Sequence, residues 1–107
     1  VVSDQVMTPT STADLAAAVS ALIRTERYGL YHVTNTGSCS WYEFAAAVFE
    51  LAGVKADLSP TTALEYGARA ARPAYSVLAH DALRAAGVPD LPHWKDALAR
   101  YLAVRAP

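Results

Sequence analysis

Apolar residues recur at the spacing of an α-helix early in the chain. The repeating positions are Leu15, Ala18, Val19, Leu22 and Ile23. Because residues three and four apart lie on the same side of a helix, these side chains would form one apolar face. Ser11 or Thr12 can cap the N–H groups at its start, and Arg24 and Arg27 suit its carboxyl end. We therefore predict a helix that begins near Ser11 and is terminated by Gly29.

A second apolar repeat follows a capping motif. Ser40 and Glu43 are three residues apart, so each side chain can accept a hydrogen bond from the other residue's N–H. The helix that begins here is expected to end at Gly53. Its buried side is predicted to contain Trp41, Phe44, Ala45, Val48 and either Leu51 or Ala52.

Short extended segments are predicted between the helices. Residues 30–34 are expected to form a strand that turn-forming residues close. A second strand is predicted over residues 57–61, at a sheet edge because Pro60 cannot donate a hydrogen bond. Residues 75–78 are expected to be a strand or extended, since Pro73 disfavours helix at the residue before it.

The later part of the chain is predicted to be mainly helical. Residues 62–71 are expected to contain a short helix and a loop, and another short helix is predicted over residues 80–86, closed by Gly87. The last helix is expected to begin near Pro92, a favoured first-turn residue. Its apolar stripe is Trp94, Leu98, Tyr101 and Leu102. We therefore predict an α/β fold, a small and mostly helical lobe with two or three short strands, as a single domain over residues 1–107.

The composition narrows the classes of function. Of the 107 residues, 53% are hydrophobic, which is enough for one core. The net charge is −1, and no basic face of the kind that binds nucleic acid is visible. No apolar run approaches the roughly 20 residues of a membrane span, and the single Cys39 suits a reducing compartment. We expect a soluble, cytoplasmic protein with no nucleic-acid or membrane partner. The apolar start at Val1 and Val2 suggests a strand entered part-way, as in a fragment of a longer protein.

Four short stretches occur in a distinctive order and spacing. They are residues 3–10 (SDQVMTPT), 29–33 (GLYHV), 40–45 (SWYEFA) and 71–78 (ARPAYSVL). Together they resemble the C-terminal substrate-binding part of the dTDP-4-dehydrorhamnose reductase family, a nucleotide-sugar group of the extended short-chain dehydrogenase/reductases. The resemblance runs from Val2 to about Leu102.

The resemblance implies a function in binding a dTDP-sugar. In that family, NADPH or NADH reduces dTDP-4-dehydro-6-deoxy-L-mannose to dTDP-L-rhamnose. The cofactor, NADP or NAD, and a catalytic Tyr-Lys pair would lie in an N-terminal Rossmann domain that is not in this chain. Two alternatives stay open: the substrate lobe of another nucleotide-sugar epimerase or dehydratase, and a non-catalytic regulatory relative.

The residues that hydride transfer needs are absent from the sequence. A dinucleotide site uses closely spaced glycines at a helix start, whereas the five glycines here are at least eight residues apart. No Tyr is followed four residues later by a Lys. His32, His80 and His93 have no Cys or carboxylate at metal-ligand spacing. We therefore expect this chain alone to be inactive and to bind neither cofactor nor metal.

The resemblance assigns substrate binding first to the loop that contains Gln5 and Thr10. This loop is expected between a strand end and the first helix. The Gln side chain offers both a donor and an acceptor, which suits a sugar hydroxyl or a base edge. Met7 stands where related sequences often carry Gly. The alternative is that Asp4 and Gln5 only satisfy N–H groups of the loop.

The resemblance assigns the diphosphate to Arg72. A guanidinium group can bond two phosphate oxygens at once, and Pro73 would fix the backbone that aims it. Tyr75 is the fourth candidate, for stacking or hydrogen bonding. The alternatives are structural roles for Arg72 and Tyr75, such as a salt bridge, and Arg69 as the true phosphate partner.

The aromatic residues and the thiol are better explained by packing. Trp41, Tyr42 and Trp94 can stack on a thymine ring, but their helical spacing to other apolar residues favours the core. A helix N-terminus beside Cys39 can lower its pKa. Since no His-Asp arrangement supports Cys39 as a nucleophile, we expect a packed thiol.

Overall fold

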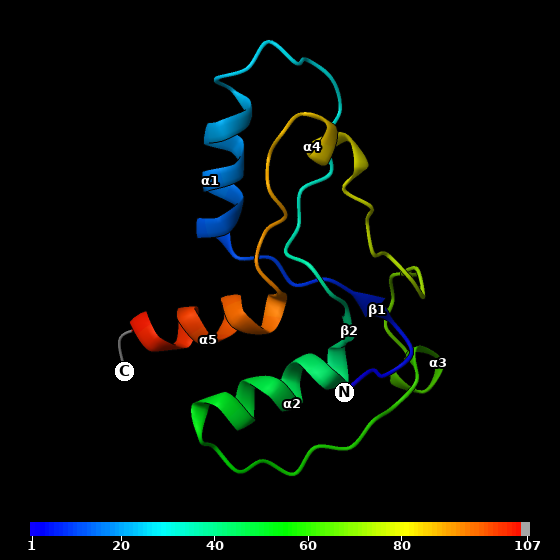
Figure 1. Ribbon diagram of the computed structural model, residues 1–107. Coiled ribbons are helices and arrows are strands. Elements are labelled where there is room, and N and C mark those ends of the chain that lie inside the picture. The colour runs from blue at the N-terminus through cyan, green and yellow to red at the C-terminus, as the bar shows by residue number, and fades with distance from the viewer. Residues whose placement is uncertain (106–107) are drawn as a thin grey trace.

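Three segments that are far apart in the sequence meet at the centre of the structure. In the computed structural model, which describes residues 1–105, β1 (Val6–Met7) pairs antiparallel with β2 (Cys39–Ser40). On its other side, Val6 forms a parallel bridge with Tyr75. β1 is therefore the element that joins the beginning, the middle and the later part of the chain (Figure 1).

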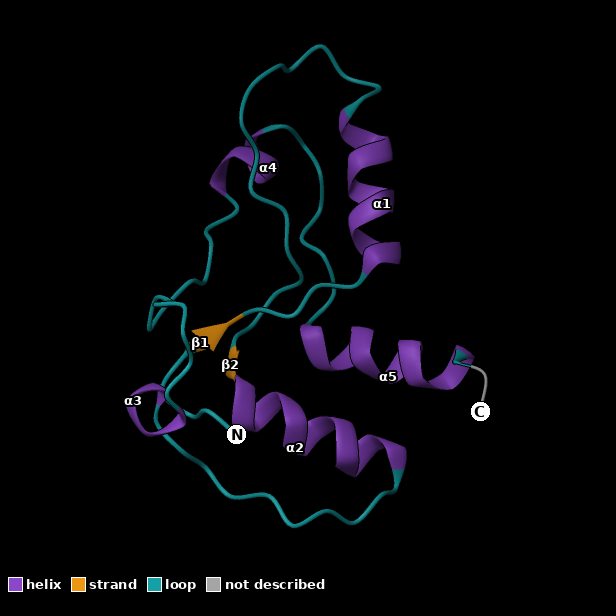
Figure 2. Cartoon of the chain, turned by 180° about the vertical axis from the view of Figure 1, so that it is seen from behind, coloured by secondary structure: helices purple, strands orange, loops and turns teal. Residues whose placement is uncertain are grey.

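Five helices surround these strands in the part of the chain that the structure describes. They are α1 (Thr12–Leu22), α2 (Trp41–Ala52), α3 (Ala63–Tyr66), α4 (Asp81–Ala85) and α5 (Trp94–Val104). α2 follows β2 directly and packs against α5. Figures 1 and 2 show α1 and α4 at one end of the molecule and α2 and α3 at the other. The α/β character agrees with the prediction, and the two strands contain two residues each.

The buried apolar residues form two small clusters. The first lies at the end with α1 and α4, and consists of Ala18, Leu83, Val88 and Leu91. The second lies between β2, α2 and α5, and consists of Cys39, Ala47 and Trp94. Many large apolar side chains lie outside both clusters, among them Tyr28, Leu30 and Leu64, each more than 80% exposed.

The predicted N-terminal caps of α1 and α2 and the predicted end of α2 are confirmed. The Ser11 hydroxyl accepts a hydrogen bond from the Asp14 N–H at 3.3 Å. α1 begins at Thr12, the residue after Ser11. In α2, the Glu43 N–H donates to the Ser40 hydroxyl and the Ser40 N–H donates to the Glu43 carboxylate, both at 3.0 Å. Gly53 ends α2 with φ of 69°. The two predicted short helices appear as α3 and α4.

The predicted end of the first helix is wrong. α1 ends at Leu22, so Arg24 and Arg27 lie beyond it and Gly29 does not terminate it. The cause is Thr25, whose N–H and hydroxyl both donate to the Leu22 carbonyl, at 3.0 and 2.8 Å. A side chain that bonds the backbone locally competes with the helical pattern. The expected apolar face is also incomplete, because only Ala18 on α1 is buried.

Some expectations about the other two long helices, α2 and α5, are corrected. Trp41, which is predicted to be buried, is 46% exposed at the first position of α2. Leu51 and Ala52 are exposed as well. α5 begins at Trp94, so Pro92 precedes the helix rather than lying in its first turn, and Tyr101 is 59% exposed. The Pro92 carbonyl instead accepts a hydrogen bond from the Thr36 N–H at 3.2 Å.

The strand predicted over residues 30–34 is wrong, and the other two predicted extended segments form single bridges rather than full strands. Residues 30–34 form no strand, residues 57–61 contribute one bridge between Thr61 and Val2, and residues 75–78 contribute the Tyr75 bridge. A strand needs a neighbouring segment at ladder spacing, and among residues 1–105 no backbone bonds to residues 30–34. The strands form instead at β1 and β2, where two segments lie side by side.

Candidate functional site

The backbone beside Gln5 lies against the segment that contains Tyr75. The Val6 N–H donates to the Ala74 carbonyl at 2.8 Å, and the Ser76 N–H donates to the Val6 carbonyl at 3.0 Å. Gln5 immediately precedes β1, rather than following a strand as expected, and is half-buried. Tyr75 is 66% exposed. The structure therefore brings the Gln5 and Tyr75 backbones together although they are far apart in sequence.

Arg72 and Arg69 lie on the exposed segment that leads to Tyr75. Within residues 1–105, neither has a carboxylate at ion-pair distance, in contrast to Arg84 and Arg100. In the described part of the chain, Arg72 therefore forms no structural salt bridge. No hydrogen bond joins the Arg72 and Gln5 side chains there either.

Thr10 lies apart from the other three candidates, at the start of α1. Its hydroxyl donates to the Thr8 carbonyl and accepts a hydrogen bond from the Asn35 N–H, each at 3.4 Å. Because a hydroxyl has one donor and two acceptor positions, one acceptor position is left for a ligand. Thr10 therefore has a structural task in addition to any contact with substrate.

Asp4 has the structural role that the alternative described. Its carboxylate accepts a hydrogen bond from the Ala63 N–H at 2.9 Å, at the first residue of α3. A carboxylate at a helix N-terminus satisfies a free N–H group. No such bond is formed by the Gln5 side chain within residues 1–105, so its donor and acceptor are available.

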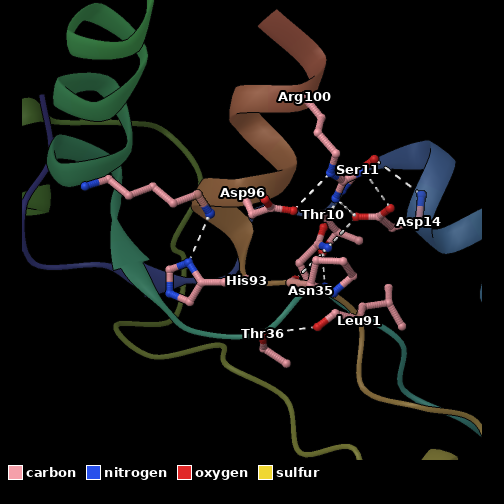
Figure 3. Close-up of polar contacts among 11 residues, drawn as sticks. Thr10, Ser11, Asp14, Asn35, Thr36, Leu91, His93, Asp96 and Arg100 are labelled. Carbon is pink, nitrogen blue, oxygen red and sulfur yellow. Dashed lines mark hydrogen bonds and ion pairs between the residues drawn. The ribbon is translucent and has the colours of Figure 1, made fainter. Parts of the chain in front are cut away.

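A polar network around Asn35 was missed by the sequence analysis, which treated this region only as a turn. The Asn35 side chain is fully buried. Its Oδ1 accepts a hydrogen bond from the Ser11 N–H at 2.7 Å, and its Nδ2 donates to Asp14 Oδ2 at 2.8 Å and to the Pro92 carbonyl at 2.9 Å (Figure 3). Nothing in the sequence separates this residue from an ordinary turn Asn, since its partners come from distant segments.

Asp14 extends this network to α5. Its carboxylate accepts two hydrogen bonds from Arg100, at 3.0 and 2.7 Å, and Arg100 also bonds Asp96 at 3.0 Å. The hydrogen bond from Arg100, followed by the one from Asn35, lowers the pKa of Asp14 below its usual value. The carboxylate is therefore charged at neutral pH and holds α1 against α5.

Two hollows border this part of the structure. The larger, of about 830 Å³, is mostly apolar and runs between residues 9–13, α2 and α5; Phe44, Leu98 and Tyr101 line it. The smaller, of about 340 Å³, lies beside Thr8 and is bordered by His80 and Arg84. Of the four predicted site residues, only Thr10 borders either hollow.

Cys39 and Trp94 are packing residues, whereas Trp41 is exposed. Cys39 is 2% exposed, and burial, with a contribution from the Glu43 charge, raises its pKa to about 11. The suggested lowering of its pKa is therefore wrong, and the packed thiol is confirmed. Trp94 is buried and packs edge-on against Phe44, with ring centroids 6.0 Å apart.

The glycines of the described residues are dispersed along the chain. The five glycines have positive φ, but each lies in a separate turn, so no backbone cradle for a pyrophosphate exists among residues 1–105. No group of three potential metal ligands is present in that range. None of the described helices is both long and apolar enough to span a bilayer.

Known proteins match this chain almost from end to end. The family described as the RmlD substrate binding domain matches residues 1–106. The spore coat polysaccharide biosynthesis protein SpsK of Bacillus subtilis (strain 168) is 49% identical over 99% of this chain and 37% of its own length. A dTDP-4-dehydrorhamnose reductase of Streptomyces griseus is 44% identical over 92% of this chain and 34% of its own length.

A solved structure is similar over the same region. The crystal structure of dTDP-4-dehydrorhamnose reductase from Bacillus anthracis str. Ames in complex with NADP aligns with a TM-score of 0.95 and 46% identity, over 98% of this chain and 37% of that one. The chain thus spans about a third of the length of the proteins it matches. The family match includes all four candidate residues, from Gln5 to Tyr75. On this agreement of sequence and fold, the chain belongs to the RmlD substrate-binding domain family.

Proposed function

We propose that this chain is the nucleotide-sugar-binding lobe of a dTDP-4-dehydrorhamnose reductase, which reduces dTDP-4-dehydro-6-deoxy-L-mannose to dTDP-L-rhamnose. The observation that carries the proposal is the fold shared with a reductase of that name in complex with NADP, at a TM-score of 0.95. The cofactor, NADP or NAD, and the proton donor belong to a Rossmann domain outside this chain. The lobe alone is inactive and works in the cytoplasm as part of the longer protein.

The lobe contributes binding and orientation of the substrate. Arg72 bonds the diphosphate, and it is suited to this because no carboxylate of residues 1–105 neutralises it. Gln5 and Tyr75 bond the sugar or the base from two segments that the Val6 backbone holds together. Thr10 adds a contact through its remaining acceptor position. When bound, the nicotinamide supplies the hydride.

The proposal is tested on the longer protein that contains this lobe. Purified protein should consume NADPH when given dTDP-4-dehydro-6-deoxy-L-mannose and should form dTDP-L-rhamnose, while the 107-residue lobe alone consumes none. A protein that binds the dTDP-sugar without reducing it would favour the regulatory alternative. Absence of dTDP-sugar binding would refute the proposal.

One relative suggests a different nucleotide sugar as the substrate of this lobe. SpsK, at 49% identity, is named for spore coat polysaccharide biosynthesis. That name specifies no dTDP-rhamnose product, so a different nucleotide sugar is the second candidate substrate. The same assay, repeated with other dTDP- and UDP-linked 4-keto sugars, separates the two. A kcat/KM that is higher for another sugar would assign the lobe to that substrate.

A further inference from the structure

Residues 6–11 and 35–40 run antiparallel to each other, but they form a β-ladder at one end only. At that end, β1 pairs with β2. Further along, the Thr8 hydroxyl donates to the Gly37 carbonyl at 2.7 Å. At the far end, the Ser11 N–H donates to Asn35 Oδ1. The Asn35 side chain therefore takes the place of a backbone partner where the ladder has stopped.

The hydrogen bonds of the Asn35 side chain use both the N–H donors and the oxygen of its amide. A side-chain amide has two N–H donors, and here both are used, by Asp14 and by the Pro92 carbonyl. Its oxygen accepts from Ser11, and the residue has no exposure to water that would replace these bonds. Figure 3 shows Ser11 and Asp14 converging on Asn35.

The Asn35 amide joins the candidate binding loop to the rest of the lobe. The loop from Gln5 to Thr10 is held at one end by β1. At the other end it is held by the Asn35 N–H, which bonds Thr10, and by the Asn35 side chain, which bonds Ser11. Arg100 anchors this end further through Asp14.

We propose that Asn35 is a positioning residue of the nucleotide-sugar site. It fixes Thr10 relative to Gln5 without touching the ligand itself. Because the inference names a supporting residue of the site assigned above, it rests on the proposed function. A loop that is free at one end must be ordered by the ligand, and that cost weakens binding.

The test is Asn35→Asp in the longer protein, with KM for the dTDP-sugar measured between about pH 6 and pH 8. The change replaces the NH₂ group by an oxygen that faces the Asp14 carboxylate and the Pro92 carbonyl. When ionised, this carboxyl repels both; when it binds a proton, it can donate to one of them. Asp14 and burial favour the protonated form, whereas Arg100 opposes it.

We expect the KM of Asn35→Asp for the dTDP-sugar to be about fivefold above the wild-type KM near pH 8. As the pH falls, this KM should approach the wild-type value. The KM for NADPH should stay unchanged. A matched control is Val88→Ala, which removes buried methyl groups from the apolar cluster between α1 and α4. Val88→Ala should lower stability, but the ratio of its KM for the dTDP-sugar to the wild-type KM should not change with pH. An unchanged KM for Asn35→Asp, or the same pH-dependent rise in Val88→Ala, would overturn the proposal.

A second measurement needs no substrate. In Asn35→Ala, the Ser11 N–H loses its acceptor, so the peptide that contains residues 8–11 should exchange amide hydrogens about tenfold faster. The peptide around Glu43 should exchange at the wild-type rate. If the longer protein binds no dTDP-sugar, the proposed function fails, and this measurement still decides whether Asn35 orders the loop. If Asn35→Ala does not fold, the Asn35→Asp kinetics decide.

Discussion

Arg100 binds the carboxylate of Asp14 with two hydrogen bonds, of 3.0 and 2.7 Å, across 86 positions of sequence. The pair joins α5 to α1, and Asn35 bonds the same carboxylate from a third segment. This carboxylate is therefore the meeting point of α1, α5 and the segment that contains Asn35.

The pH dependence of stability should reveal this pair. Because the Arg100 and Asn35 hydrogen bonds lower the pKa of Asp14, the folded state binds a proton there less readily than the unfolded state. The stabilisation is complete above the unfolded value of about 3.9 and is lost as the pH falls through the lower folded value. Thermal unfolding of Arg100→Ala should therefore show a shallower loss of stability below about pH 4. Parallel curves for wild type and variant would contradict this.

The capping box should make a measurable contribution to stability. Ser40→Ala removes the acceptor for the Glu43 N–H at the start of α2, and we expect a loss of about 1 kcal/mol. Urea denaturation measures it. Ser38→Ala is the matched control, because Ser38 is exposed and caps no helix. Equal midpoints for the two variants would mean that the cap does not contribute.

The arginine that meets the diphosphate can be identified in the longer protein. Arg72→Ala should weaken binding of the dTDP-sugar tenfold or more, since a charge-assisted bond contributes about 1.5–3 kcal/mol, and leave NADPH affinity unchanged. Arg69→Ala is the matched control, and Gln5→Ala should show a smaller loss. Isothermal titration measures all three. A loss in Arg69→Ala instead would transfer the role to Arg69.

Gly37 should tolerate no side chain. It has φ of 82°, and an added Cβ would meet the His93 ring, 2.7 Å from its Cδ2, and Trp94 Cδ1 at 3.1 Å. Gly37→Ala therefore combines backbone strain with a clash, and we expect a loss of about 2–4 kcal/mol. Gly67→Ala shares the strain, with φ of 71°, but meets no atom within 4 Å. Chemical denaturation should show the larger loss for Gly37, and equal losses would rule out the clash.

Cys39 should react slowly with thiol reagents. The reactive thiolate is rare at neutral pH, because burial raises the pKa to about 11, and the side chain is 2% exposed. Labelling of the folded chain near pH 8 should be at least about tenfold slower than labelling in urea. Comparable rates would place Cys39 at the surface.

The local features of this fold were predictable because their causes lie within a few residues. The Ser40–Glu43 capping box, the Ser11 cap and the turn at Gly53 depend only on neighbouring backbone groups. The four stretches that led to the family were also local. The candidate residues Gln5, Thr10, Arg72 and Tyr75 stay predictions, since each was chosen from the resemblance.

Features that need a distant partner were decided by the tertiary structure. The segment predicted as a strand at residues 30–34 has no backbone hydrogen-bond partner in the described chain, whereas Val6 becomes a strand residue because Ser40 and Tyr75 lie on either side of it. Asn35 reads as a turn residue until Asp14, Ser11 and Pro92 surround it. The sequence by itself thus determined the N-terminal caps of α1 and α2, the presence of the helices and the family. Strand pairing and the buried network were decided in three dimensions, because a hydrogen bond between distant segments exists only once both are in place.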